Sequence, residues 1–129
     1  MQWDASPWGG FTTGPARPWL PVGDTAACNM AVQREDPSSV LRYCRDLISL
    51  RRAEIGTQIA NYAQLPAPAG SWCYTSGPLT VAANFADQPV PLPGFDGDAV
   101  RLSSLGVDHA SDDVLTLAPW EGIIAGQQR

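Results

Sequence analysis

Glycine and proline interrupt the first 35 residues of the chain so often that no helix or strand of ordinary length is expected there. The interruptions are Gly9-Gly10, Gly14-Pro15, Pro18, Pro21 and Gly23-Asp24, all of which favour turns. The same stretch carries Trp3, Trp8, Phe11, Trp19 and Leu20. Disordered linkers are poor in such residues, and loops longer than about 15 residues are usually functional or disordered. We therefore predict an ordered aromatic loop that packs against another surface.

One amphipathic helix is predicted over residues 36–53, DPSSVLRYCRDLISLRRA. Asp36 is a suitable N-cap and Pro37 then falls at the first helical position, where it loses no hydrogen bond. The spacing i, i+3, i+4, i+7, i+8 predicts one buried face, made of Val40, Leu41, Cys44, Leu47 and Ile48. Either the chain's own sheet covers this face, or the helix belongs to a larger layer outside the chain.

Short strand-like runs separated by Gly, Pro, Asp and Asn make up residues 57–129. The runs are TQIANYAQL, SWCYTS, LTVAANFA, PVPL, AVRLSS, DVLTL and EGIIAG. This pattern is typical of an antiparallel sandwich or barrel. The predicted fold class is therefore α+β, with a long aromatic loop and one helix followed by an antiparallel β-sandwich.

Charge and hydropathy exclude several classes of partner. The net charge is −5 and the sequence contains no lysine, so the clustered basic residues that bind nucleic acid are missing. No apolar run is long enough for a transmembrane helix. The N-terminus lacks the basic and apolar regions of a signal peptide. We therefore expect a cytoplasmic protein with no nucleic-acid or membrane partner.

The cysteines are Cys28, Cys44 and Cys73, an odd number with no CxxC pairing. This spacing argues against zinc and against a thioredoxin-like site. Buried free thiols are the expected state, with a disulfide from Cys28 to Cys44 or Cys73 left open. No cofactor is predicted.

No set of residues with catalytic spacing is evident. His109 is the single histidine and lies in a polar turn, GVDHASDD, so we predict a solvated side chain. Asp96-Gly97-Asp98 starts like a calcium loop but continues as a strand, so we predict a turn there. No catalytic residue and no metal ligand is assigned.

Five blocks of sequence together resemble the α-glucosidases of glycoside hydrolase family 13. They are MQWD at 1–4, GFTTG at 10–14 with PWLPV at 18–22, NMAVQ at 29–33 followed by the helix segment, VAANF at 81–85, and LAPWE at 117–121. This family includes oligo-1,6-glucosidases, and trehalose synthases are close relatives. The resemblance covers nearly the whole chain.

The resemblance implies that this sequence is the end of a longer enzyme. Residues 1–56 would be the remnant of a catalytic (β/α)8 barrel, with the loop after strand 8 and helix 8, and residues 57–129 a C-terminal antiparallel β-domain. Since barrel active sites lie on the loops after the strands, Gln2, Trp3 and Phe11 would lie at the rim of the sugar pocket. The implied ligand is an α-glucoside or a maltooligosaccharide, and the implied partner is the missing barrel.

The two carboxylates of a retaining glycosidase are not among the residues of this chain. In the family they lie in a G-R-D segment and a later glutamate segment, followed by an NHD motif, and none of these occurs here. We therefore expect the parent to be an α-glucosidase and this chain to be inactive alone. The alternative is a stand-alone carbohydrate-binding module that uses the aromatic loop, or an interaction module that docks on a separately encoded barrel.

Overall fold

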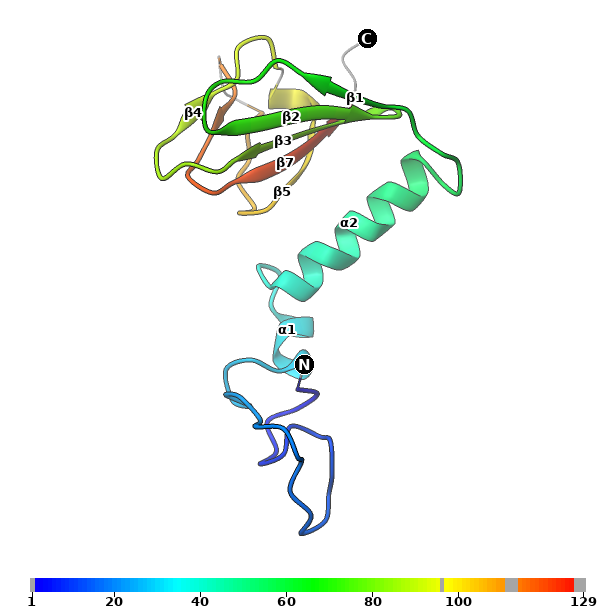
Figure 1. Ribbon diagram of the computed structural model, residues 1–129, viewed down its shortest axis with the longest axis vertical. Helices are drawn as coiled ribbons and strands as arrows, with labels where there is room; N and C mark the ends of the chain where they lie inside the picture. Colours follow the sequence, from blue (N-terminus) through cyan, green and yellow to red (C-terminus); the bar gives the residue numbers. More distant parts are fainter. Residues whose placement is uncertain (1, 96, 111–113, 127–129) are drawn as a thin grey trace. The chain divides into compact units, whose positions relative to one another are not determined.

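A computed structural model of the protein describes residues 2–95, 97–110 and 114–126. The chain divides into two compact units, Met1–Asp46 and Leu47–Arg129, and each is described by itself. Figure 1 shows two helices followed by a β-structure, with the boundary between the units inside the second helix. The boundary predicted at residue 56 stays a prediction.

The first unit contains a short helix that the sequence analysis missed. Helix α1, Met30–Glu35, is capped by Asn29, whose side-chain oxygen accepts from the Val32 N–H at 2.9 Å. Asn29 is fully buried and also donates to the carbonyl of Thr25 at 2.8 Å. The prediction of an irregular chain up to residue 35 is therefore wrong here, because a buried cap stabilises six residues free of glycine and proline.

Helix α2, Val40–Glu54, begins later than predicted. Its cap is Ser39, whose hydroxyl oxygen accepts from the Arg42 N–H at 3.2 Å. Asp36 instead closes a turn, accepting from the N–H and the hydroxyl of Ser38 at 2.8 and 2.7 Å. These bonds hold the pKa of the Asp36 carboxyl below its ordinary value. Gly56 ends the helix with a φ of 65°, as expected.

Each strand-like run of the sequence contains an observed strand. The strands are β1 Tyr62–Leu65, β2 Ser71–Ser76, β3 Leu79–Asn84, β4 Val90–Pro91, β5 Val100–Ser103, β6 Thr116–Leu117 and β7 Gly122–Gly126, with a 3-10 turn, η1, at Gly97–Ala99. The prediction of short strands after the helix is confirmed.

The strands form two antiparallel sheets. The larger has the order β1-β2-β3-β7-β5, and β4 pairs with β6 in a sheet of two. The last two strands are therefore consecutive in sequence but lie in different sheets. The chain changes sheet at the Pro119-Trp120 turn, where Trp120 adopts a φ of 61°.

The hydrophobic core joins the two sheets. Cys73 lies opposite Ala82, and Ala82 opposite Ile123, across three neighbouring strands. These side chains pack in one cluster with Val90 and Leu117 of the other sheet, and with Leu92 and Leu115. A two-layer β-domain is thus present, as the fold class predicted.

The cysteine prediction is partly wrong. All three cysteines are free, but Cys28 and Cys44 are exposed and only Cys73 is buried. Burial raises the pKa of the Cys73 thiol, so this thiol is a core side chain with little thiolate character.

Among the described residues of the first unit, no apolar side chain is buried. Its buried residues are Gly9, Asn29 and Ser39, whereas every buried apolar side chain of the described residues lies between Cys73 and Ala125. The helix face predicted to be buried is not: no residue of α2 is buried, and Val40 is 74% exposed. Neither described helix has the length and apolar character needed to cross a membrane.

Candidate functional site

Gln2 fixes the start of the aromatic loop against helix α1. Its carbonyl accepts from the Met30 N–H at 2.9 Å, and the next carbonyl, of Trp3, accepts from Ala31 at 3.1 Å. The Trp3 N–H in turn donates to the carbonyl of Gly9 at 2.8 Å. Residues far apart in an irregular segment are thus held by backbone hydrogen bonds.

The Gln2 side chain is held by the loop itself. With its nitrogen facing the Cys28 carbonyl, it donates there at 3.0 Å and accepts from the Gly23 N–H at 3.1 Å. A Cβ placed on Gly9 or on Gly23 would come within 2.9 Å of Gln2 side-chain atoms. A side chain at position 9 or 23 would therefore crowd Gln2. We call the Gln2 amide, which connects the segments around Gly23 and Cys28 by hydrogen bonds, the Gln2 bracket.

A hollow of about 370 Å³ opens beside this bracket. It is lined by Gln2, Phe11 and residues 18–23, and the lining is mostly apolar. Its size falls in the usual range of small-molecule sites, and aromatic faces suit the C–H faces of a sugar. Two of the three predicted rim residues, Gln2 and Phe11, come together here, whereas Trp3 does not line the hollow.

The carboxylates of Asp4 and Asp24 accept hydrogen bonds from nearby N–H groups within turns of the loop. Asp4 accepts from the Ser6 N–H at 2.9 Å, and hydrogen bonding from Ser6 lowers the pKa of its carboxyl. Asp24 accepts from the N–H groups of Ala26 and Ala27 at 2.9 and 3.0 Å. Both carboxylates therefore serve to stabilise turns of the loop.

The second unit contains a buried polar cluster that the sequence analysis missed. Glu121 is fully buried, and one of its oxygens accepts from the Ser103 hydroxyl at 2.5 Å and lies 3.0 Å from Nε2 of His109. Its other oxygen accepts from the Ala118 N–H at 2.8 Å. His109 is only 3% exposed, so the prediction of a solvated histidine is wrong.

These are the residue types of a catalytic triad in a different arrangement. In a triad the histidine lies between the hydroxyl and the acid, whereas here the Glu121 carboxylate lies between Ser103 and His109. The cluster instead ties the segment after β5 to the start of β7. The sequence signal for it was a single acid inside the apolar run LTLAPWEGIIAG.

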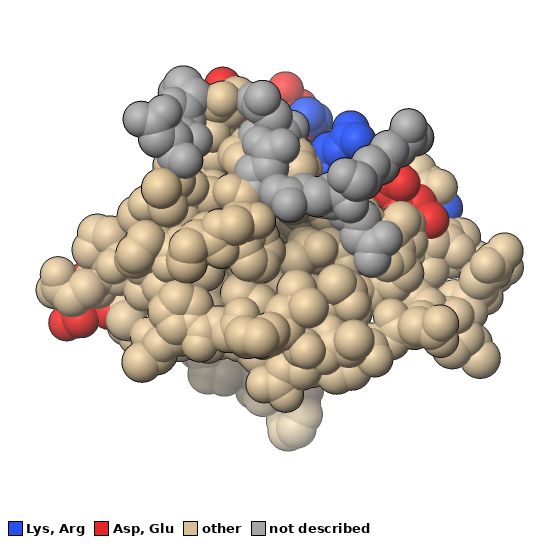
Figure 2. All heavy atoms as spheres, turned by 90° about the horizontal axis from the view of Figure 1, so that it is seen from above, with Lys and Arg blue, Asp and Glu red and all other residues tan. Residues whose placement is uncertain are grey.

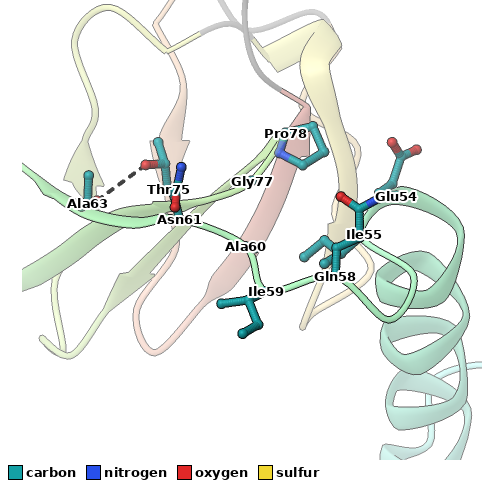
Figure 3. Close-up of a pocket in the computed structure, with 10 residues that line it drawn as sticks. All are labelled: Glu54, Ile55, Gln58, Ile59, Ala60, Asn61, Ala63, Thr75, Gly77 and Pro78. Atoms are coloured by element: carbon teal, nitrogen blue, oxygen red, sulfur yellow. Dashed lines mark hydrogen bonds between the residues drawn. The ribbon is translucent and has the colours of Figure 1, made fainter.

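A further pocket of about 380 Å³ lies in the second unit. Figure 3 shows its lining residues, which come from the end of α2, the segment that follows it, strand β1 and the β2–β3 region. Glu54 is the single ionisable residue of this lining, so the pocket lacks the second carboxylate of a glycosidase.

The described part of the chain contains no group of three or more His, Cys, Asp or Glu side chains that could hold a metal ion. In the Asp96-Gly97-Asp98 turn, Asp96 lies outside the described residues, and Gly97 begins the 3-10 turn η1. A Cβ on Gly97 would meet the His109 carbonyl at 2.0 Å, so this glycine packs directly on the cluster segment.

Known α-glucosidases resemble the chain in sequence. It is 45% identical over 133 residues to the oligo-1,6-glucosidase of Parageobacillus thermoglucosidasius, with 94% of the chain and 23% of that enzyme covered. It is 35% identical over 130 residues to the oligo-1,6-glucosidase of Heyndrickxia coagulans, with 96% and 23% covered. The chain thus spans about a quarter of the length of these curated relatives. No protein-family model matches it.

Two solved structures of synthases resemble the chain in fold over nearly its whole length. An isomaltulose synthase from Erwinia rhapontici NX5 superposes with a TM-score of 0.78 at 29% identity, over 99% of this chain and 24% of that one. A trehalulose synthase superposes with a TM-score of 0.76 at 29% identity, over 98% and 24%.

The fold, two helices followed in sequence by antiparallel sheets, is consistent with the C-terminal β-sheet domain of glycoside hydrolase family 13 enzymes. The chain matches a C-terminal fragment of oligo-1,6-glucosidases, which are α-glucosidases of this family.

Removing the carboxylate of the buried cluster tests its structural role. We expect Glu121→Ala to lower the free energy of unfolding by about 3 kcal/mol, because Ser103, His109 and the Ala118 N–H lose a buried acceptor. Urea unfolding followed by circular dichroism measures this. The exposed Asp87→Ala serves as control and should stay within about 0.5 kcal/mol of the unchanged protein. Equal effects of the two substitutions would contradict the assignment.

Proposed function

We propose that this chain supplies the last part of the catalytic barrel and the C-terminal β-domain of an α-glucosidase that hydrolyses α-glucosidic bonds. The observation that carries the proposal is that the first unit has no core among its described residues: none of its described apolar side chains is buried, and Trp19 is 92% and Phe11 54% exposed. A segment with so much apolar surface and no core of its own needs a partner surface.

Helix α2 supports the same proposal. In a (β/α)8 barrel, each outer helix buries one apolar stripe against the strands. The stripe of α2 has this spacing and is open, with Cys44 exposed and Ile48 49% exposed. A barrel belonging to the longer enzyme would cover it.

Substrate binding would use the hollow of the aromatic loop. Phe11 would present its ring to the sugar, Trp3 would lie at the rim, and Gln2 would shape the hollow through Gly23 and Cys28. The substrate class is an α-glucoside or maltooligosaccharide, in a cytoplasmic enzyme. The reacting carboxylates would come from the preceding barrel sequence, since this chain lacks the motifs that carry them in the family.

The purified chain tests where the catalytic groups lie. Incubated with maltose and with isomaltose, it should release no more glucose than buffer does, because neither a nucleophile nor a general acid is in place. A coupled glucose assay measures this, with an intact α-glucosidase as the positive control. Glucose release by the chain alone would show that the proposed division of labour is wrong.

A charge placed on the open helix stripe tests whether this face needs a cover. Ile48→Asp should reduce self-association of the isolated chain, because it interrupts an exposed apolar stripe. The matched control is Ser49→Asp, which adds the same charge at a neighbouring exposed position. Analytical ultracentrifugation compares the two. If both variants change the mass distribution equally, net charge rather than the stripe governs association.

A further inference from the structure

Three aromatic side chains form a row on the larger sheet. The ring of Tyr74 on β2 lies 5.2 Å from that of Tyr62 on β1 and 5.1 Å from that of Trp72, measured between centroids. The planes are tilted by 38° and 40°. None of these residues belongs to the aromatic loop, and the resemblance to α-glucosidases did not draw on them.

The row faces away from the core. Side chains alternate along a strand, and Cys73, between Trp72 and Tyr74, is fully buried in the core cluster. Tyr62 is 57% exposed and Trp72 is 44% exposed. The rings are therefore presented to solvent from paired strands, which hold their backbone in place before any ligand binds.

The surroundings of the row are uncharged and partly polar. Gln64 is opposite Tyr74 in the β1–β2 register, and Ser76 is opposite Tyr62. On β3, Val81 is opposite Tyr74 and Ala83 is opposite Trp72. The sequence has no charged residue from Ile55 to Ala86. Figure 2, a view of one face of the molecule without residue labels, shows mostly residues other than Lys, Arg, Asp and Glu. Ligands that are recognised by ion pairs, such as phosphates or acidic peptides, find no partner in this row.

We propose that Tyr62, Tyr74 and Trp72 form a binding face for a neutral α-glucan chain. A glucan offers apolar C–H faces that stack on aromatic rings, and hydroxyl groups that match the Gln64 amide and the tyrosine hydroxyls. The choice of an α-linked glucan rests on the proposed function.

The area of the row favours a sugar over a protein partner. An aromatic side chain offers about 150–250 Å² in full, so three half-exposed rings present roughly 300 Å². A stable protein interface buries about 800 Å² on each side. A short stretch of glucan, in contrast, is covered by a few rings.

Binding is tested on the full chain with maltoheptaose, by isothermal titration calorimetry. Trp72→Ala and Tyr62→Ala should each weaken binding about tenfold, the loss expected for one stacked ring. Phe85→Ala is the matched control, because it removes an aromatic side chain that is as exposed as Tyr62, at 57%, but lies outside both the row and the hollow. Circular dichroism of each variant checks that the sheet is intact, and Tyr62→Ala at the sheet edge stands in if Trp72→Ala fails to fold.

Unchanged binding in Phe85→Ala with weakened binding in the row variants supports the proposal. No detectable binding by the chain, or row variants that bind as tightly as Phe85→Ala, overturns it. Row variants that alter only the oligomeric mass would reveal a protein interface and would also overturn it. These outcomes are independent of glucose release, so failure of the binding face and failure of the proposed function are distinguishable.

Discussion

The β-domain depends on one layer of apolar side chains buried between two sheets. Cys73, Ala82 and Ile123 align across β2, β3 and β7, and the β4–β6 pair closes over them with Val90 and Leu117. This packing fixes the register of the sheet, since a slip by one residue would turn the buried set outward. The same register places Trp72 and Tyr74 on the opposite face. The core and the aromatic row therefore follow from a single alternation.

The two units differ in what stabilises them. The β-domain has a core and a buried Ser103–Glu121–His109 cluster, whereas the segment up to Asp46 is held by backbone hydrogen bonds, the Gln2 bracket and the Asn29 cap. Hydrogen bonds without apolar burial contribute little net free energy. The proposed function offers a reason for this contrast, because the barrel of a longer enzyme would cover the exposed rings and the helix stripe.

Sequence reasoning located the strands, because alternation and turn residues are local signals. It misplaced the start of α2, because Asp36 and Ser39 are both good caps and only the contacts of Ser39 with Gln33 and Arg42 decide between them. It missed α1, whose first N–H groups donate to Gln2 and Trp3. It also missed the burial of His109 beside Glu121. In both cases the partner is distant in sequence. Of the three residues predicted at the rim of the sugar pocket, Gln2 and Phe11 both line the hollow. Their spacing in the sequence could not have predicted that they lie together.

In the isolated chain, the two units should differ in the free energy of local unfolding. Native-state hydrogen exchange measures this residue by residue. We expect strong protection of the amides in β2, β3 and β7. The amides of residues 2–35 should exchange near the rate of an unfolded chain. Protection of residues 2–35 equal to that of the central strands would contradict this expectation, because the aromatic loop would then be stable without a further partner.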